Sequence, residues 1–308
     1  MIATENCKIR IIEEGLEIFV GDSDPDSVIK GLNDIIYCRN IDFYLIYQNN
    51  KIYKKDIDGN LPYLFLDLIC GPKFGHRFIY SDIHERLIIA KDKITRSSIN
   101  LETKEIEIEI PKSEGDSIVH LELYRKDQDR VVALTKDGYL FASELDFSKK
   151  QGEIITVISI GHMINKLEEA GTVVVCPRSR YFFVEVYMND PEFHFCSKMI
   201  IFSLKNETFQ REAVFCNYGH YYIGCKAVMN CLGYFKNTIV FMGLTLMKGS
   251  YAQLFSYNTD TKEFEEMKEV RVKHQEFDPF KMTKVGNSFY YTGRWSKIMK
   301  LTVKSKSD

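Results

Sequence analysis

The segment Glu105-Ile106-Glu107-Ile108-Glu109-Ile110 alternates strictly between acidic and aliphatic residues. Because successive side chains of a β-strand point to opposite faces, this pattern predicts a strand with one buried face and one face in water. Charged side chains also discourage pairing with further strands at the edge of a sheet. We therefore interpret residues 105–110 as the outer strand of a sheet.

More apolar runs recur along the whole chain, and each is apolar on both faces. Both-face apolarity predicts strands that are sandwiched between neighbouring sheets. These runs, which we name strands b, lie at residues 43–47, 87–90, 131–134, 181–187, 238–242 and 288–292. A second type, strand c, follows each of them after a short connection, at residues 51–53, 93–95, 139–141, 198–200, 253–255 and 297–299.

A further strand on each side completes the repeating unit. Strand a precedes b, as at residues 118–124 and 171–176, and strand d follows c, as at residues 105–110. Copies of strand c are spaced by roughly 40 to 60 residues, the length of a β-propeller blade. A β-sandwich would instead alternate in nearly every strand. The sequence predicts an all-β fold, a β-propeller of six four-stranded blades, with seven blades as the alternative.

The two ends of the chain carry the signal for ring closure. The last unit has strands near residues 280–285, 289 and 297–303 but no fourth strand, and Lys8 to Ile12 forms a strand without a unit of its own. Pairing the two would remove a free edge. We therefore expect residues 1–308 to form one propeller domain that is closed by the N-terminal strand. Short helical insertions are expected after Asp24-Pro25 and within residues 161–171.

The connection between strands c and d provides a family resemblance. It reads NLETKEIE at 100–107, NTDTKEFE at 258–265 and, in a shorter copy, NETF at 206–209. A polar turn followed by an apolar residue that starts the outer strand resembles the same connection in kelch-type propellers. Tyr257 and Phe264 match that pattern, whereas the paired glycine of kelch repeats is replaced by single glycines.

Glycine-histidine pairs resemble, to a lesser degree, those of WD-repeat propellers. They occur at residues 75–76, 161–162 and 219–220, each shortly before a first strand. The Trp-Asp half of that motif is missing, because Trp295 is the single tryptophan. The resemblance implies a propeller and leaves the subfamily open.

Composition restricts the partners. Net charge is −2 and 27% of residues are charged, so a large phosphate-neutralising surface, and therefore nucleic acid, is not expected. No apolar run is long enough to span a membrane, and the N-terminus lacks the pattern of a signal peptide. Eight scattered cysteines, several of them in apolar runs, predict free thiols in the cytoplasm or nucleus.

Metal-binding and catalytic interpretations are weaker than their structural alternatives. Cys216, His220, Cys225 and Cys231 do not have zinc-knuckle spacing. The aspartates near residue 24 lack the later residues of a calcium loop, and no nucleophile elbow or phosphate-binding loop occurs. Isolated histidines are more often structural than catalytic; the candidates are His76, His120 and His220. No cofactor, no metal and no enzymatic activity are expected.

Aromatic and basic residues gather in predicted b–c and d–a connections, which share one rim of a propeller. Such side chains are enriched among interface anchors. The candidates are Trp295, Arg294, Phe193, His194, Phe195, Tyr218, His220 and Tyr221. The sequence therefore predicts a non-enzymatic interaction module that binds a protein or peptide on this rim, within a larger complex. The alternative is a propeller hydrolase or lactonase with its site in the central funnel.

Overall fold

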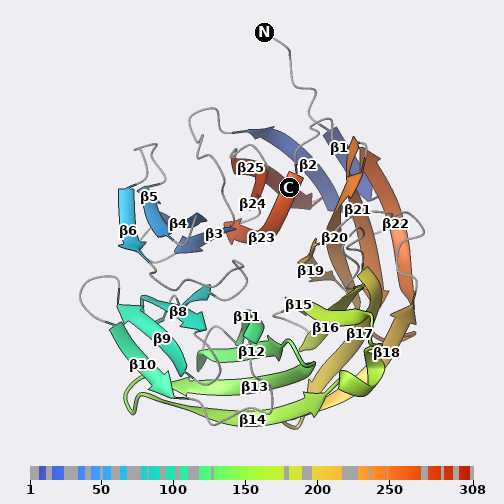
Figure 1. Ribbon diagram of the computed structural model, residues 1–308. Coiled ribbons are helices and arrows are strands. Elements are labelled where there is room, and N and C mark those ends of the chain that lie inside the picture. The colour runs from blue at the N-terminus through green and yellow to red at the C-terminus, as the bar shows by residue number, and fades with distance from the viewer. Residues whose placement is uncertain are drawn as a thin grey trace. The chain divides into compact units, whose positions relative to one another are not determined.

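The computed structural model describes an all-β chain, and its strands are labelled in Figure 1. The described residues are 7–11, 16–23, 34–38, 43–48, 51–56, 63–67, 78–81, 83–90, 95–100, 105–109, 118–125, 128–176, 180–188, 196–216, 228–235, 237–247, 249–271, 277–285, 288–293 and 298–305. They divide into two compact units: Met1–Gly75 with Lys248–Ala252 and Glu269–Asp308, and His76–Met247 with Gln253–Lys268.

The second unit holds most of four successive groups of four strands, which we number sheets 2 to 5. Sheet 2 contains β7 (Phe78–Ser81), β8 (Arg86–Ala90), β9 (Thr95–Asn100) and β10 (Glu105–Glu109). Sheet 3 contains β11 (Ile118–Arg125), β12 (Arg130–Thr135), β13 (Tyr139–Asp146) and β14 (Gln151–Ser159). Sheet 4 contains β15 (Glu168–Cys176), β16 (Tyr181–Met188), β17 (Cys196–Lys205) and β18 (Thr208–Cys216). Sheet 5 contains β19 (Val228–Phe235), β20 (Thr238–Met247), β21 (Gly249–Asn258) and β22 (Phe264–Arg271).

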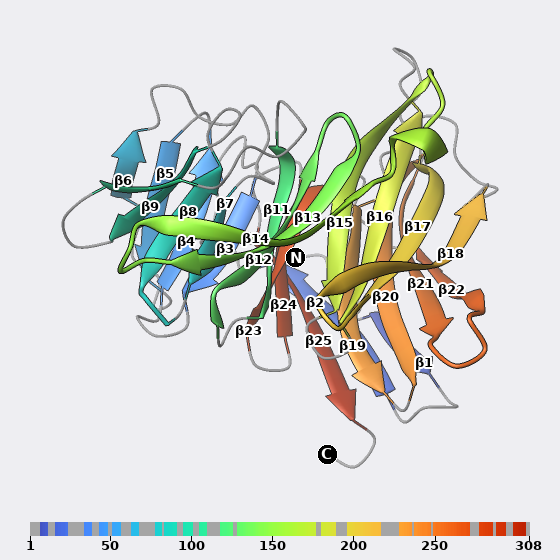
Figure 2. The ribbon, with the colours of Figure 1, turned by 90° about the horizontal axis from the view of Figure 1, so that it is seen from below.

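Strands within each sheet follow the order of the sequence, as predicted for strands a to d. The pairs are antiparallel, and Figure 2 shows β15, β16 and β17 side by side in sheet 4. One feature was not predicted: Glu109 of β10 and Gln151 of β14 form a parallel bridge that joins the outer strands of sheets 2 and 3. The predicted positions of strands b and c are confirmed to within a few residues.

Burial follows the predicted gradient from inner to outer strands. In β12 and β16 only the end residues are partly exposed, whereas β14 alternates between exposed and covered positions. The first strands of neighbouring sheets lie beside one another, because β11 contacts both β7 and β15, and β15 contacts β19. An inner strand is therefore covered on both faces by adjacent sheets, which explains its continuous apolar sequence.

Hydrophobic clusters fill the spaces between neighbouring sheets. Phe182, Phe202 and Phe209 of sheet 4 pack with Tyr124 and Val132 of sheet 3. Sheets 4 and 5 meet through rings from both sides, among them Phe183, Phe241 and Tyr257. Each fully buried aromatic side chain contributes about 2 to 3 kcal/mol to folding by leaving water, so these layers hold the sheets of the second unit together.

The first unit contains two sheets. Sheet 1 runs β3 (Asp34–Cys38), β4 (Phe43–Gln48), β5 (Lys51–Asp56) and β6 (Tyr63–Asp67). The other, sheet 6, runs in the order β1 (Cys7–Ile11), β2 (Leu16–Ser23), β25 (Ile298–Ser305), β24 (Ser288–Gly293) and β23 (Phe277–Val285).

The N-terminal segment joins the last sheet, but by a different strand from the one predicted. β2 pairs with β25, from Leu16 opposite Ser305 to Ser23 opposite Met299. The predicted strand, Lys8 to Ile12, corresponds to β1, which pairs with β2 and lies outermost. We predicted a single N-terminal strand because residues 16–23, which form the second strand of the hairpin, do not alternate clearly between polar and apolar side chains.

The predicted helix within residues 161–171 is wrong in extent. A 3-10 turn covers Gly161–Met163, and β15 already begins at Glu168. The helical insertion expected after Asp24-Pro25 lies outside the described residues.

Candidate interaction surfaces

The eight residues predicted to bind a partner all lie outside the described residues. They are Trp295, Arg294, Phe193, His194, Phe195, Tyr218, His220 and Tyr221. Their role stays a prediction. Two connections of the same predicted rim are described, both in sheet 3: the b–c turn at residues 136–138 and the d–a connection at residues 160–167.

These two connections meet, so b–c and d–a connections share one end of sheet 3, as predicted. The Ile160 amide donates a hydrogen bond to the Gly138 carbonyl at 2.7 Å. Gly138 has φ of 81°, and a Cβ there would lie 3.0 Å from Ile164. Glycine is required because the turn needs a left-handed residue and has no room for a side chain. We call this end the b–c rim.

The d–a connection of the b–c rim carries an exposed leucine on a firmly held turn. Leu167 is 65% exposed, the highest value among the large apolar side chains that the structure describes. The turn is held because Lys198 Nζ of β17 donates to the Met163 carbonyl at 2.7 Å and lies 2.7 Å from Glu168 Oε2. Glu168 Oε2 also accepts from the Asn165 amide at 2.9 Å. Leu167 therefore sits on an ordered loop that cannot easily fold the side chain inward.

The opposite end of the sheets, the a–b rim, carries the a–b and c–d turns. A residue with positive φ precedes strand b in four of the sheets that the structure describes: Glu85, Asp129, Arg180 and Asn237. The next residue then reaches the c–d turn of the following sheet. Three such contacts are described: Arg86 with Phe147, Arg130 with Glu207, and Tyr181 with Lys262. The same backbone geometry thus joins three pairs of sheets through three different side-chain chemistries.

A serine, a histidine and an aspartate meet at the first of these junctions. The Ser81 hydroxyl donates to Asp129 Oδ1, and His84 Nε2 lies 2.7 Å from Asp129 Oδ2. Burial raises the pKa of Asp129, while Ser81, His84 and Arg86 oppose that change. Both Ser81 and His84 use the carboxylate as their acceptor, so His84 is not placed as a general base for the Ser81 hydroxyl. The arrangement ties sheet 2 to sheet 3.

The third junction is centred on a carboxylate. Glu212 of β18 accepts hydrogen bonds from Ser203, from Lys205 at 2.8 Å and from Lys262 at 2.9 Å. Burial alone would raise the pKa of Glu212, but these three donors outweigh it and lower the pKa to about 2. Lys262 in turn donates to the Tyr181 hydroxyl at 2.9 Å. The cluster fastens the c–d turn of sheet 5 to sheet 4.

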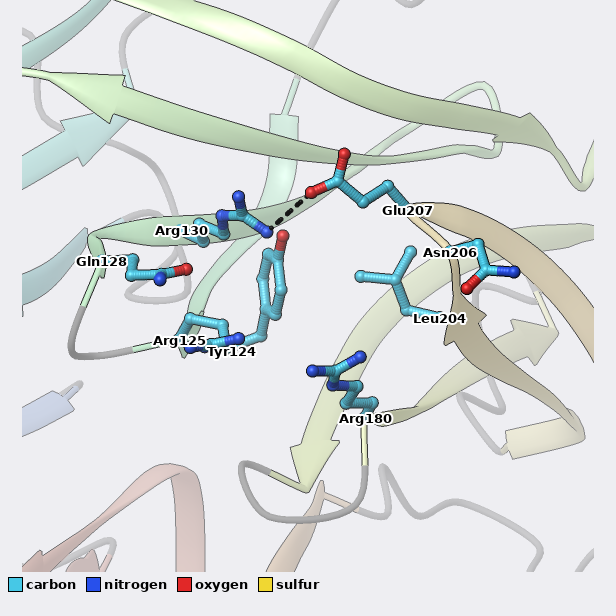
Figure 3. A pocket seen from close by; sticks show the side chains of 8 residues that line it. All are labelled: Tyr124, Arg125, Gln128, Arg130, Arg180, Leu204, Asn206 and Glu207. Carbon is cyan, nitrogen blue, oxygen red and sulfur yellow. Dashed lines mark hydrogen bonds and ion pairs between the residues drawn. The ribbon is translucent and has the colours of Figure 1, made fainter.

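The second junction borders a pocket of about 250 Å³ between sheets 3 and 4, drawn in Figure 3. Its lining is rich in guanidinium groups: Tyr124, Arg125, Gln128, Arg130, Arg180, Leu204, Asn206 and Glu207. Arg130 is engaged by Glu207 at 3.1 Å and by Glu144 at 2.8 Å. Arg180 is exposed and makes no ion pair or hydrogen bond with side chains that the structure describes. The pocket can accept a negatively charged group.

The sequence did not predict this pocket, because the turns of the a–b rim were interpreted only as polar turns without a binding role. The short turn Asn206-Glu207 was recognised as polar, and both of its residues have positive φ, as in a tight hairpin turn. The pocket also needs Arg125 and Arg130 from sheet 3 and Arg180 from sheet 4. Arg180 lies 50 or more positions from the other two, so only the packing of the sheets brings them together.

Metal and membrane sites are not found within the described ranges. No group of histidine, cysteine or acidic side chains there has the arrangement of a metal site, and Cys176 and Cys231 form no disulfide with a described residue. His120 is buried on β11, while His76 and His220 lie outside the described residues. No described helix has the length and apolar character needed to cross a membrane.

Comparison with known proteins establishes the fold. No protein family matches the sequence, and no curated protein sequence matches it. Among solved structures, the β-propeller domain of Nup133 from Vanderwaltozyma polyspora is similar over 98% of this chain and 100% of that chain, with a TM-score of 0.59 and 10% identity. The N-terminal domain of Nup159 is similar over 89% of this chain and 76% of that chain (TM-score 0.53, 11% identity). The WD40 repeats of RRP9 are similar over 92% and 100% (TM-score 0.53, 7% identity).

The chain therefore has the fold of a β-propeller domain. At these identities the likeness concerns the fold and not a shared activity. The likeness extends to the propeller fold in general, so the kelch-type resemblance of the c–d turns stays a prediction.

Proposed function

We propose that the protein is a non-enzymatic interaction scaffold, a six-bladed propeller closed by the N-terminal hairpin, that binds a protein or peptide on its b–c rim. The similar solved structures support this proposal, because two are nucleoporin domains and the third is a set of WD40 repeats. Both compact units would contribute blades to one domain. A place in a larger nuclear or cytoplasmic complex fits these neighbours.

The observation that carries the choice of rim is Leu167. An isolated exposed leucine needs no explanation, but this one lies on a loop that a partly buried lysine, Lys198, fixes to the next sheet. Ordering the loop before a partner arrives reduces the entropy cost of binding. The aromatic and basic residues predicted for the same rim, with Trp295 and Phe193 among them, would provide further anchors for the partner.

The test is a pull-down from native extract with the full-length protein and two pairs of variants. Leu167→Ser is matched by Ile83→Ser, which alters another exposed aliphatic residue (49% exposed) in a turn of the a–b rim. Trp295→Ala is matched by Thr261→Ala in a c–d turn. We expect Leu167→Ser and Trp295→Ala to weaken partner binding by about 2 kcal/mol, and the matched variants to bind like the parent protein.

Two results would contradict the proposal. Undiminished partner recovery by both b–c rim variants would show that this rim is not the interface. Loss of recovery with Ile83→Ser or Thr261→Ala alone would place the interface on the a–b rim instead.

A further inference from the structure

The pocket between sheets 3 and 4 has an excess of positive charge. Three guanidinium groups line it, those of Arg125, Arg130 and Arg180, whereas Glu207 is its single acidic residue. Both Glu207 and Glu144, which lies outside the lining, pair with Arg130, so the positive charge of Arg180 is left without a carboxylate among the described side chains. A guanidinium presents a planar fork of N–H donors and has no acceptor, so the leftover charge favours an anion with two oxygens.

A buried hydroxyl in the same pocket also lacks an acceptor. Tyr124 is 4% exposed, and its hydroxyl donates to no acceptor among the described residues. The guanidinium of Arg130 lies near enough to Oη to interact with it, but a guanidinium can only donate. Figure 3 shows this hydroxyl pointing toward the pair formed by Arg130 and Glu207. Burial raises the pKa of Tyr124, and the neighbouring Arg130 only partly opposes this. The hydroxyl therefore keeps its proton at neutral pH, and a guanidinium cannot accept that proton. A buried donor without an acceptor is unfavourable, and an anion in the pocket would remove this cost.

The size of the pocket restricts the ligand. Sites for whole small molecules usually enclose about 300 to 1,000 Å³, whereas this pocket has about 250 Å³. It has room for one side chain and lies below the range that is usual for ligands of the size of a nucleotide. The single leftover positive charge matches a carboxylate better than a phosphorylated side chain, which carries a charge of about −2.

We propose that this pocket binds a glutamate or aspartate side chain from an acidic segment of a partner protein. Arg180 would supply the free fork, Tyr124 would donate its hydroxyl proton to the carboxylate, and Arg125 would add positive charge at the mouth. This would be a second contact surface, on the a–b rim, and it does not depend on the b–c rim being an interface.

The probe is a fluorescein-labelled peptide of alternating glutamate and glycine, with a glutamine–glycine peptide as its uncharged match. Fluorescence anisotropy is measured with the full-length protein at low salt, up to about 1 mM protein. We expect the glutamate peptide to bind, the glutamine peptide not to bind, and Arg180→Glu to weaken binding by about tenfold or more. Lys149→Glu makes the same charge change on another turn of the a–b rim and should alter binding by less than about twofold, an effect of screened long-range charge.

Tyr124→Phe separates a role in binding from a role in folding. The variant should weaken peptide binding severalfold while changing the melting temperature little, because the hydroxyl donates to no acceptor within the described structure. A melting temperature that falls together with affinity would show that the hydroxyl serves the fold and would remove it from the site.

Competition distinguishes the sources of the anion. A peptide of alternating phosphoserine and glycine that binds more tightly than the glutamate peptide would overturn the carboxylate assignment. Displacement of the glutamate peptide by inorganic phosphate at equal concentration would do the same. Equal weakening by Arg180→Glu and Lys149→Glu, or no binding of the glutamate peptide, would overturn the site. None of these results affects the b–c rim, which Leu167 and Trp295 test.

Discussion

Replacing Glu212 by glutamine should weaken the attachment of sheet 5 to sheet 4 in a pH-dependent way. Three hydrogen bonds converge on this carboxylate, and its side chain is 10% exposed. The shift of its pKa from 4.5 to about 2 corresponds to about 3 kcal/mol at neutral pH, at 1.36 kcal/mol per unit. Lys205 and Lys262 are 53% and 36% exposed, so solvent screens their charges. We therefore expect Glu212→Gln to lose about 2 kcal/mol at pH 7.

The sign of the pH dependence follows from the lowered pKa. A carboxylate with a depressed pKa stabilises the fold fully above pH 4.5, and this contribution is lost as the pH falls toward 2. Urea unfolding of the parent and of Glu212→Gln should therefore differ at pH 7 and converge near pH 2.5. The difference between the two proteins cancels the other titrating groups. A difference that is absent at pH 7, or that stays constant down to pH 2.5, would refute the reasoning.

Three further predictions concern stability. Gly171→Ala should destabilise the fold by about 3 kcal/mol, because a Cβ at Gly171 would lie 1.9 Å from the Tyr187 ring. The control in thermal melting is Gly161→Ala, where the atom nearest to an added Cβ is 3.4 Å away. Equal melting temperatures of the two variants would show that the Tyr187 ring moves aside freely. Lys198→Met should lower the free energy of unfolding by about 3 kcal/mol or more, because it removes the cation that pairs with the buried Glu168 carboxylate. Adding Glu168→Gln should restore part of this stability in chemical denaturation. If it restores none, the loss comes from the packing of the Lys198 side chain and not from its charge. Deleting residues 1–23 removes β2, which pairs with β25, whereas deleting residues 1–14 removes only the outer strand β1. The longer deletion should lower the melting temperature much more than the shorter one. Equal melting temperatures would contradict a closing role for β2.

Strand positions were predictable because they depend on local sequence. Continuous apolar runs such as residues 131–134 and 181–187 are buried inner strands, as their pattern predicted. The apolar residue after the c–d turn was also predicted, and Phe209 and Phe264 pack into the spaces between sheets. Periodicity of side chains reports the face of a strand directly, so a single sequence carries this information.

The residues of the pocket were not predictable in the same way. Arg180 and Glu207 look like ordinary polar turn residues, and nothing local to either shows that sheet packing brings them to the same pocket as Tyr124. The N-terminal hairpin shows a related limit, because which of its two strands meets β25 depends on long-range register. Contacts between distant segments are set by packing, which the local pattern does not encode.

The three junctions of the a–b rim differ in how solution conditions act on them. Added salt screens the ion pair of Arg130 with Glu207, which lies at the surface, but has much less effect on the guanidinium of Arg86 above the Phe147 ring. Acid acts on the third junction, through Glu212, and salt also screens the exposed lysines that pair with this carboxylate. High salt should therefore increase hydrogen exchange at both boundaries of sheet 4, whereas low pH should increase it mainly at the boundary with sheet 5. Boundaries that share one backbone geometry, like the three described, can in this way respond differently to the same solvent.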